Sequence, residues 1–353
     1  MFELSIPGRI CFYGDHQDYL GLPVIAGTIN RYIYLKALPI SSAHFQINLK
    51  DYNESFIVNF QEEPSMIRPG DYFRAGLCVL KKEGIIPNKG FCVDISGDLP
   101  SNSGLSSSSA LVVSWIKFLV SVYAPRLNAS DIQIAKWAFS TEVEFFNQSG
   151  GIMDQFTISL RGLIYINTNN KSYKRLNGDF GSLLIIESGI PKDTQELLKQ
   201  AKEKSQKAID LIKNNNKKFE ILKSDKNHYE LYKNYLPKDL QPYWKAAIHN
   251  FVITKKAKQI LNKKKTSKIL LGNLMNAHQK ILQNEIKNTP SKIIKQLEAG
   301  NKAGTFGSKI VGSGGGGCMV AMLDKKNIFA VKKAFIDSGA KAVHEVELIY
   351  PKN

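Results

Sequence analysis

Four consecutive serines at the start of an apolar helix restrict the fold of this 353-residue chain more than any other feature. Segment Leu99–Leu111 reads LPSNSGLSSSSAL and leads into Ser107–Tyr123, whose pattern predicts a buried helix. The N–H groups at a helix start are unpaired and carry partial positive charge, which suits bound phosphate. A serine-rich helix cap is the alternative, but four serines exceed what one cap needs. The segment therefore predicts a phosphate-binding loop built onto a core helix.

A run of glycines near the C-terminus predicts a second loop. Segment Lys309–Met319 reads KIVGSGGGGCM and has strand-like residues on both sides. Such a run could form a flexible linker, but the tight apolar flanks favour a strand–glycine–strand hairpin whose backbone closes over a ligand. Gly312, Gly314 and Gly317 fit the dinucleotide pattern G-x-G-x-x-G, but that pattern must open a helix, and a strand-like run follows here. We therefore exclude a dinucleotide-binding loop, and no G-x-x-x-x-G-K-[ST] motif occurs.

A third polar cluster follows the first strand-like segment, in the residues PGRICFYGDHQDYLG. It places the cation Arg9, the carboxylates Asp15 and Asp18 and the imidazole of His16 around one predicted turn. These groups suit recognition of several hydroxyls, and a charged surface turn is an equal alternative.

One further carboxylate stands in an apolar setting. Segment Gly150–Phe156, GGIMDQF, places Asp154 among isoleucine, methionine and phenylalanine. A carboxylate in such surroundings needs a partner. A functional role for Asp154 is therefore the favoured interpretation.

The length predicts two compact units, and the composition changes near residue 180. The first half reads as mixed strand and helix, and the second half as lysine-rich helices that close with strands. We therefore predict a unit over residues 1–180 and another over 181–353. The strongest strand patterns are Phe2–Tyr13, Arg31–Leu38, Phe56–Phe60, Phe91–Ile95, Leu163–Asn167, Ser182–Glu187, Ser308–Val311, Cys318–Leu323 and Ala342–Ile349. The further helix patterns are Ser130–Phe146, Asp193–Lys213, Leu240–Lys264, Gly272–Ile286 and Ile328–Ser338.

The net charge of +17 has several explanations. It could serve nucleic acid, an anionic membrane or a nucleotide substrate. The lysines of residues 255–265 lack interleaved aromatic residues and are typical of a solvated helix face. The longest apolar stretch, Ala110–Ala124, is too short to span a bilayer, and no secretory signal is visible. We expect a cytoplasmic protein that binds neither nucleic acid nor membrane.

Taken together and in this order, the segments resemble the GHMP kinase superfamily, and its galactokinase-like members most. PGRICFYGDHQDYLG is similar to the sugar signature PGR…GEHTDYNGG, GIMDQ to the segment of the catalytic aspartate, and GNLMNAHQKILQNEIKNTP to the stretch before the third motif. The resemblance implies an α+β, two-domain GHMP kinase fold. Its N-terminal domain would be mixed α/β, its C-terminal domain ferredoxin-like α+β, and its active site would lie in the cleft between them.

The resemblance also implies roles for individual residues. Asp154 matches the catalytic aspartate and Arg9 the cation beside it. Ser108 and Glu142 match the Mg²⁺ ligands, although Glu142 could instead be an exposed helix acid. The implied ATP and phosphate residues are Gly104, Leu105, Ser106, Ser107, Ser108 and Ser109, and the implied sugar residues are Asp15, His16, Asp18, Gly312, Gly314 and Gly315.

The chain departs from the galactokinase pattern in the sugar signature and in the stretch before the third motif. Asp15 replaces the usual glutamate, Gln17 replaces the usual threonine, and residues 276–278 read Asn-Ala-His where Glu-Ser-His is usual. These departures bear on the identity of the sugar more than on the type of reaction.

The resemblance implies an ATP- and Mg²⁺-dependent sugar kinase that transfers the γ-phosphate to a sugar hydroxyl, by analogy the anomeric one. The alternatives are a GHMP kinase for heptose phosphate, fucose, arabinose, glucuronate or mevalonate, and a non-catalytic sensor of sugar and ATP. The expected partners are a small-molecule sugar and ATP, and the expected state is a monomer or homodimer.

Overall fold

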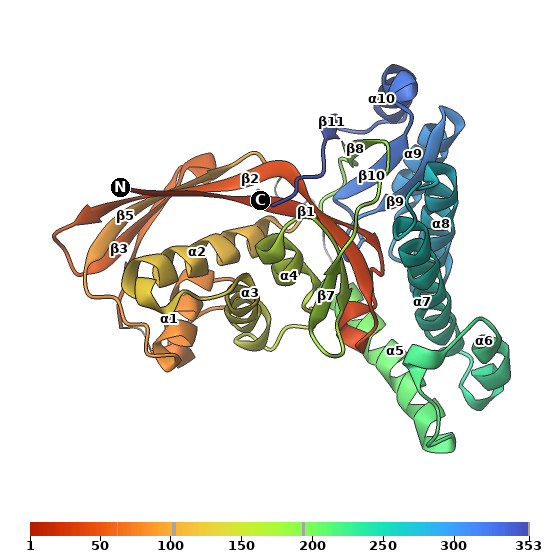
Figure 1. Cartoon of the computed structure of the whole chain (residues 1–353), viewed down its shortest axis with the longest axis horizontal. Helices are drawn as coiled ribbons and strands as arrows, with labels where there is room; N and C mark the ends of the chain where they lie inside the picture. The colour runs from red at the N-terminus through yellow and green to blue at the C-terminus, as the bar shows by residue number, and fades with distance from the viewer. Residues whose placement is uncertain (62, 101–103, 193–194, 352–353) are drawn as a thin grey trace.

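The computed structural model describes residues 1–61, 63–100, 104–192 and 195–351, and their strands form two sheets (Figure 1). The first sheet has seven strands in the order β4-β3-β5-β2-β6-β7, with β1 paired to β2. All neighbours in it are antiparallel except β3 and β5. Its strands are β1 (Phe2–Tyr13), β2 (Val24–Ile40), β3 (His44–Leu49), β4 (Glu54–Asn59), β5 (Gly90–Gly97), β6 (Leu163–Asn167) and β7 (Ser172–Arg175).

The first sheet is covered by helices of the first half of the chain (Figure 1). They are α1 (Tyr72–Lys82), α2 (Ser107–Tyr123), α3 (Asp131–Phe139) and α4 (Met153–Leu160). As its apolar sequence predicts, α2 is the central one, and Trp115 and Phe118 on it are buried against Phe45 of β3. The indole N–H of Trp115 donates to the carbonyl of Phe73, 3.0 Å away. The polar group of this buried side chain is therefore hydrogen-bonded.

The second sheet confirms the ferredoxin-like C-terminal fold. It is antiparallel, with the order β11-β8-β10-β9. Its fourth strand therefore pairs with its first, and helices connect the first strand to the second and the third to the fourth. The strands are β8 (Ser182–Glu187), β9 (Thr305–Ile310), β10 (Cys318–Leu323) and β11 (Ala342–Val346), and the packed helices are α8 (Lys268–Ile281), α9 (Ser291–Lys302) and α10 (Ile328–Asp337).

The lysine-rich region forms the helices α5 (Gln195–Asn215), α6 (Asn227–Tyr232) and α7 (Gln241–Leu261). Together they enclose a separate apolar cluster around Trp244. Leu22, from the loop after β1, is fully buried in this cluster. The start of the chain is thus packed against helices that follow it by about two hundred residues.

Several predicted boundaries differ from the observed ones. The helix expected over residues 130–146 changes to a π-helical turn at Ser140–Glu144, and α8 begins at Lys268 instead of Gly272. The helix expected from Asp193 has its first two residues outside the described part of the chain. Strands β3 and β7 were not predicted.

The predicted unit boundary near residue 180 falls between β7 and β8, the last strand of one sheet and the first of the other. One apolar cluster nevertheless includes Ile10 and Ile25 before this point and Leu183 and Val320 after it. The sheets thus share part of their core, and the division into units 1–180 and 181–353 stays a prediction. Within the described residues, no helix is long and apolar enough to cross a membrane.

Candidate active site

Most of the predicted site residues line one cavity of about 600 Å³. This volume is typical of sites for small-molecule ligands. The loop after β1, the start of α2, the turn before α4 and the glycine-rich loop after β9 contribute to its wall. The predicted residues that line it are Arg9, Asp15, His16, Asp18, Gly104, Ser106, Ser107, Ser108, Ser109, Glu142, Asp154 and Gly312.

Arg9 and Asp154 form a bidentate ion pair in this cavity. The Nε and Nη2 atoms of Arg9 each donate to an oxygen of Asp154 over 2.8 Å. The hydroxyl of Ser106 donates to the same carboxylate at 2.5 Å. Arg9 is 3% exposed, whereas the Asp154 side chain is 27% exposed and so remains open to a ligand. Burial is the largest single influence on the pKa of Arg9 and acts to lower it, but Asp154 together with Cys11 and Asp15 outweighs burial, so that this pKa is raised.

The start of α2 is tied to the same pair. Arg9 donates through Nη1 to the carbonyl of Gly104 at 2.6 Å, and its backbone N–H donates to the carbonyl of Leu105 at 3.1 Å. Ser106 has a φ of 60°, which is uncommon for a residue other than glycine. Leu105, which was predicted to bind ATP or phosphate, is fully buried in the apolar core and is not among the residues that line this cavity. Residues 101–103 of the predicted loop lie outside the described residues.

Gly104 is required where it stands. Its φ is 85°, and an added Cβ would lie 2.6 Å from the carbonyl oxygen of Val311, just after β9. The phosphate loop and the glycine-rich loop therefore touch through backbone at this point.

Glu142 is buried, so its interpretation as an exposed helix acid is wrong. It lies in the π-helical turn that follows α3, and such turns are frequent at functional sites. Gln155 donates to its Oε2 at 2.7 Å. Burial raises the pKa of Glu142, while hydrogen bonds from Ser109, Gln155 and Ser108 act in the opposite direction.

The oxygen atoms around Glu142 fit a magnesium ion. A carboxylate and the Ser108 hydroxyl are hard donors, which Mg²⁺ prefers, and it commonly takes its remaining ligands from water and phosphate. The described residues contain no group of three or more His, Cys, Asp or Glu side chains placed to hold a metal by themselves.

Asp18 is the second acid beside Asp154. Burial, and then the charge of Asp154, raise the pKa of Asp18 to about 6. The backbone N–H of Met153 donates to Asp18 at 3.4 Å. A Cβ on Gly151 would collide with the same carboxylate, so the glycine at this position before α4 makes room for Asp18.

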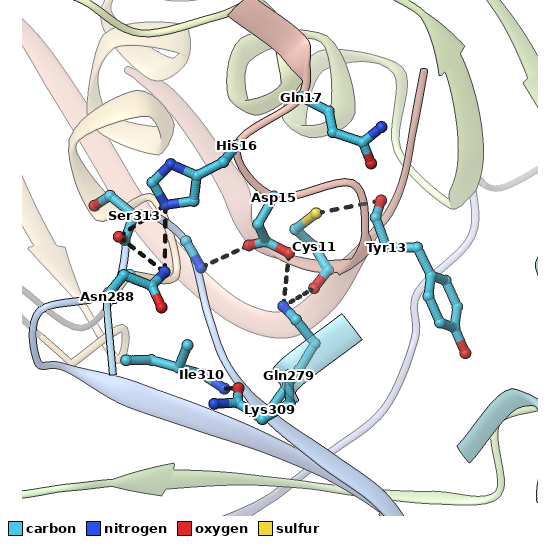
Figure 2. A network of polar contacts seen from close by, with 12 residues as sticks. Cys11, Tyr13, Asp15, His16, Gln17, Gln279, Asn288, Lys309, Ile310 and Ser313 are labelled. Atoms are coloured by element: carbon cyan, nitrogen blue, oxygen red, sulfur yellow. Dashed lines mark hydrogen bonds and ion pairs between the residues drawn. The ribbon is translucent and has the colours of Figure 1, made fainter. Parts of the chain in front are cut away.

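Asp15 and His16 have protein partners (Figure 2). Asp15 accepts from the Nζ of Lys309 at 2.7 Å and from the N–H of Gly312 at 3.0 Å. His16 contacts the Tyr19 hydroxyl through Nδ1 at 2.9 Å and the Ser313 carbonyl through Nε2 at 3.0 Å. A sugar hydroxyl would have to displace one of these groups to reach a ring nitrogen of His16.

The glycine-rich loop joins β9 to β10 as the predicted hairpin, whose strands pair antiparallel. Of the three glycines implied as sugar residues, only Gly312 lines the cavity. Gly315 donates its N–H to the carbonyl of Asn288 at 2.6 Å, and a Cβ on Gly314 would lie 2.5 Å from Asn288. Gly314 and Gly315 therefore pack the loop against Asn288. They do not line the cavity, so their contact with the sugar stays a prediction.

Sequence reasoning missed Lys309 and linked Gln17 to the identity of the sugar. Lys309 is fully buried in β9, and a fully buried lysine almost always has a charged partner. The sequence Lys309-Ile310-Val311 carries this signal, because it places a lysine in a segment predicted to be a strand next to the glycine-rich loop. Gln17 is buried and contacts Thr254 of α7 at 3.1 Å; it does not line the cavity. Gln17 thus joins the loop after β1 to α7.

Two protein-family models match the chain. The model described as GHMP kinases N terminal domain matches residues 71–162, and the one described as GHMP kinases C terminal matches residues 259–341. The chain belongs to the GHMP kinases, which makes it a kinase that transfers phosphate to a hydroxyl group.

The similar proteins include two kinds of GHMP kinase. A galactokinase of Limosilactobacillus reuteri is 29% identical over 93% of this chain and 87% of its own length. A mevalonate kinase of Methanocaldococcus jannaschii is 26% identical over 92% of both. The crystal structure of Lactococcus lactis galactokinase complexed with galactose has a TM-score of 0.88 at 20% identity, and covers 99% of this chain and 93% of that one. For the Methanococcus jannaschii mevalonate kinase structure the TM-score is 0.72 at 22% identity, covering 99% and 98%. These structural matches establish the fold.

Proposed function

We propose that the chain is a Mg²⁺-dependent sugar kinase that transfers the γ-phosphate of ATP to a sugar hydroxyl, the anomeric one. The observation that carries this proposal is the contact of Asp154 with both Arg9 and Ser106 at the start of α2. This contact brings a group that can orient a hydroxyl next to a helix start that can hold phosphate. The full-length similarity to galactokinases supports a sugar as acceptor.

Phosphoryl transfer depends mainly on positioning and on neutralising charge. Asp154 would orient the attacking hydroxyl and take its proton at a carboxylate oxygen. Arg9 holds that carboxylate in one orientation through two parallel hydrogen bonds. The N–H groups at the start of α2, with the hydroxyls of Ser107 to Ser109, would bind phosphate oxygens. When bound, Mg²⁺ would be held by Ser108 and Glu142 and would neutralise phosphate charge.

Asp18 is the strongest candidate for a ligand of the sugar hydroxyls. It lines the cavity beside Asp154, and its known partners are backbone N–H groups. A carboxylate can accept hydrogen bonds from two neighbouring hydroxyls of a sugar. This would place the acceptor hydroxyl next to Asp154.

Mevalonate is a second candidate acceptor. The archaeal mevalonate kinase aligns over 92% of both chains. The cavity is also lined by Lys192, for which the described residues supply no hydrogen bond or ion pair. The ammonium of Lys192 could pair with the carboxylate of an anionic acceptor, a partner that a neutral sugar does not need. Burial and then the charge of Arg9 lower the pKa of Lys192, whereas the charges of Asp154 and Glu142 act in the opposite direction, as a bound carboxylate would.

The test is ADP release by the purified protein with Mg-ATP and a panel of acceptors. The panel holds galactose, glucose, mannose, fucose, arabinose, glucuronate, sedoheptulose 7-phosphate and mevalonate. Turnover with a neutral sugar, and identification of its 1-phosphate by NMR, would support the proposal. Turnover with mevalonate alone would replace it by the second candidate. ATP binding without any turnover would contradict both and favour a sensor.

A further inference from the structure

A fully buried ion pair joins the loop after β1 to β9. The Nζ of Lys309 lies 2.7 Å from Oδ2 of Asp15, and the two side chains are 0% and 1% exposed. Lys309 also donates to the backbone carbonyl of Cys11 at 3.1 Å (Figure 2). Burial raises the pKa of Asp15, but Lys309 and its other neighbours outweigh burial, so that this pKa is lowered.

Such a pair is costly to bury, so its presence is weak evidence for a gain in stability. Here the second oxygen of Asp15 is also used, since it accepts the N–H of Gly312 at 3.0 Å. One carboxylate therefore connects the end of β1, the strand β9 and the first glycine of the glycine-rich loop. The first of these segments is nearly three hundred residues from the other two along the chain.

The next two residues of the same loop are also tied to later parts of the chain. His16 contacts the carbonyl of Ser313 in the glycine-rich loop, and Gln17 contacts Thr254 on α7. We call residues 14–21 the acceptor loop. The side chains of Asp15, His16 and Gln17 are thus all bonded to other parts of the chain. Asp18 follows them directly and lines the cavity beside Asp154.

We propose that Asp15 and Lys309 act as a positioning pair, which sets the acceptor loop against the glycine-rich loop and thereby Asp18 beside Asp154. In this inference Asp15 does not bind the acceptor, although galactokinase-like signatures carry an acid at this point. The term acceptor loop rests on the proposed function; the coupling of the two loops does not.

The coupling is tested by hydrogen–deuterium exchange on the protein without substrate. The variants are Asp15→Asn, Lys309→Met and the double variant, and Lys333→Met, in the exposed pair with Asp337, is the matched control. Because each single change leaves a buried charge or dipole without its partner, both should raise exchange about tenfold or more in peptides covering residues 14–21 and 312–317. In the double variant, which removes both charges, exchange in these peptides should return part of the way to the wild-type rate. In the control it should not differ from wild type.

Unchanged exchange at residues 312–317 in Asp15→Asn would overturn the inference, and so would a double variant that is worse than both singles. If Lys309→Met does not fold, Asp15→Asn and the double variant still decide the question. Because no acceptor is present, this result is independent of whether the proposed function is correct.

A second measurement separates positioning from direct contact with the acceptor. It compares kcat/KM of Asp15→Asn and wild type for the accepted sugar and for analogues that each lack one hydroxyl. A positioning role predicts the same fold-loss for every analogue, mainly in kcat, with the Kd for ATP little changed. A penalty that vanishes for one analogue would identify Asp15 as the ligand of that hydroxyl and refute the inference.

Discussion

Changing Asp18 to asparagine should stabilise the protein at neutral pH while impairing its activity. Burial and the neighbouring Asp154 raise the pKa of Asp18 to about 6. The ionised carboxylate is therefore unfavourable in the folded state. An unfolded aspartate has a pKa near ~3.9, so a difference of about two units corresponds to roughly 2–3 kcal/mol.

The sign of the pH dependence follows from the raised pKa. Between about pH 4 and pH 6 the folded protein binds more protons at Asp18 than the unfolded chain does, so stability from this group is present at low pH and lost as pH rises through about 6. The asparagine side chain of the variant carries no charge and avoids that loss. The advantage of the variant should therefore be full at about pH 7.5 and absent near pH 4.

The measurement is thermal unfolding of wild type and Asp18→Asn from pH 4 to pH 8. With an unfolding entropy of about 0.7 kcal/mol/K for a chain of this length, the variant should gain about 3–4 °C in Tm at pH 7.5. Asp337→Asn, which changes an exposed carboxylate, is the control and should show no comparable gain. In the same samples, kcat/KM for the acceptor should fall about a hundredfold, because a charged hydrogen-bond acceptor is lost.

A gain in Tm that is the same at pH 4 and pH 7.5 would refute the electrostatic explanation. It would show that the benefit comes from packing or hydrogen bonding of the new amide. A loss of stability at pH 7.5 would refute the raised pKa itself.

Three further predictions concern the catalytic and phosphate-binding groups. Asp154→Asn should lower kcat by about a thousandfold, while titration calorimetry finds ATP binding changed less than about threefold; near-normal turnover would remove Asp154 from the mechanism. Glu142→Gln should raise the Mg²⁺ concentration needed for half-maximal activity about tenfold, with rate recovered at high Mg²⁺; an unchanged Mg²⁺ dependence would contradict its role as a ligand. Gly104→Ala should destabilise the protein by about 2 kcal/mol in denaturant unfolding, because its Cβ would meet the Val311 carbonyl at 2.6 Å with φ at 85°; an equally stable variant would show that the two loops move apart freely.

Local pattern was enough for the parts of the fold that depend on near neighbours in the sequence. The apolar run of α2 is buried as predicted, and the glycine run is a hairpin between two strands because tight apolar flanks leave it no freedom as a linker. Strand β7 was missed because its four residues, Ser172–Arg175, have no apolar alternation. The π-helical turn that carries Glu142 also has no signature in the local pattern.

The candidate site shows the same division. The sequence by itself determined which chemical groups are available. These are Arg9 and Asp154 in their motifs, the serines at the start of α2, and glycines where backbone must approach backbone. Only the tertiary structure decided which of them meet. It brings Arg9 to Asp154 across 145 residues of sequence and Asp15 to Lys309 across 294.

The physical reason lies in the difference between residue type and environment. The carboxylates of Asp15, Asp18 and Asp154 are chemically the same in the sequence. Folding gives Asp15 a buried lysine, and gives Asp154 an arginine and an opening to the cavity. It gives Asp18 burial, a like charge and backbone N–H donors. Because the energy of a charge depends on what surrounds it, the same side chain becomes a positioning group, a catalytic candidate and a titrating acid.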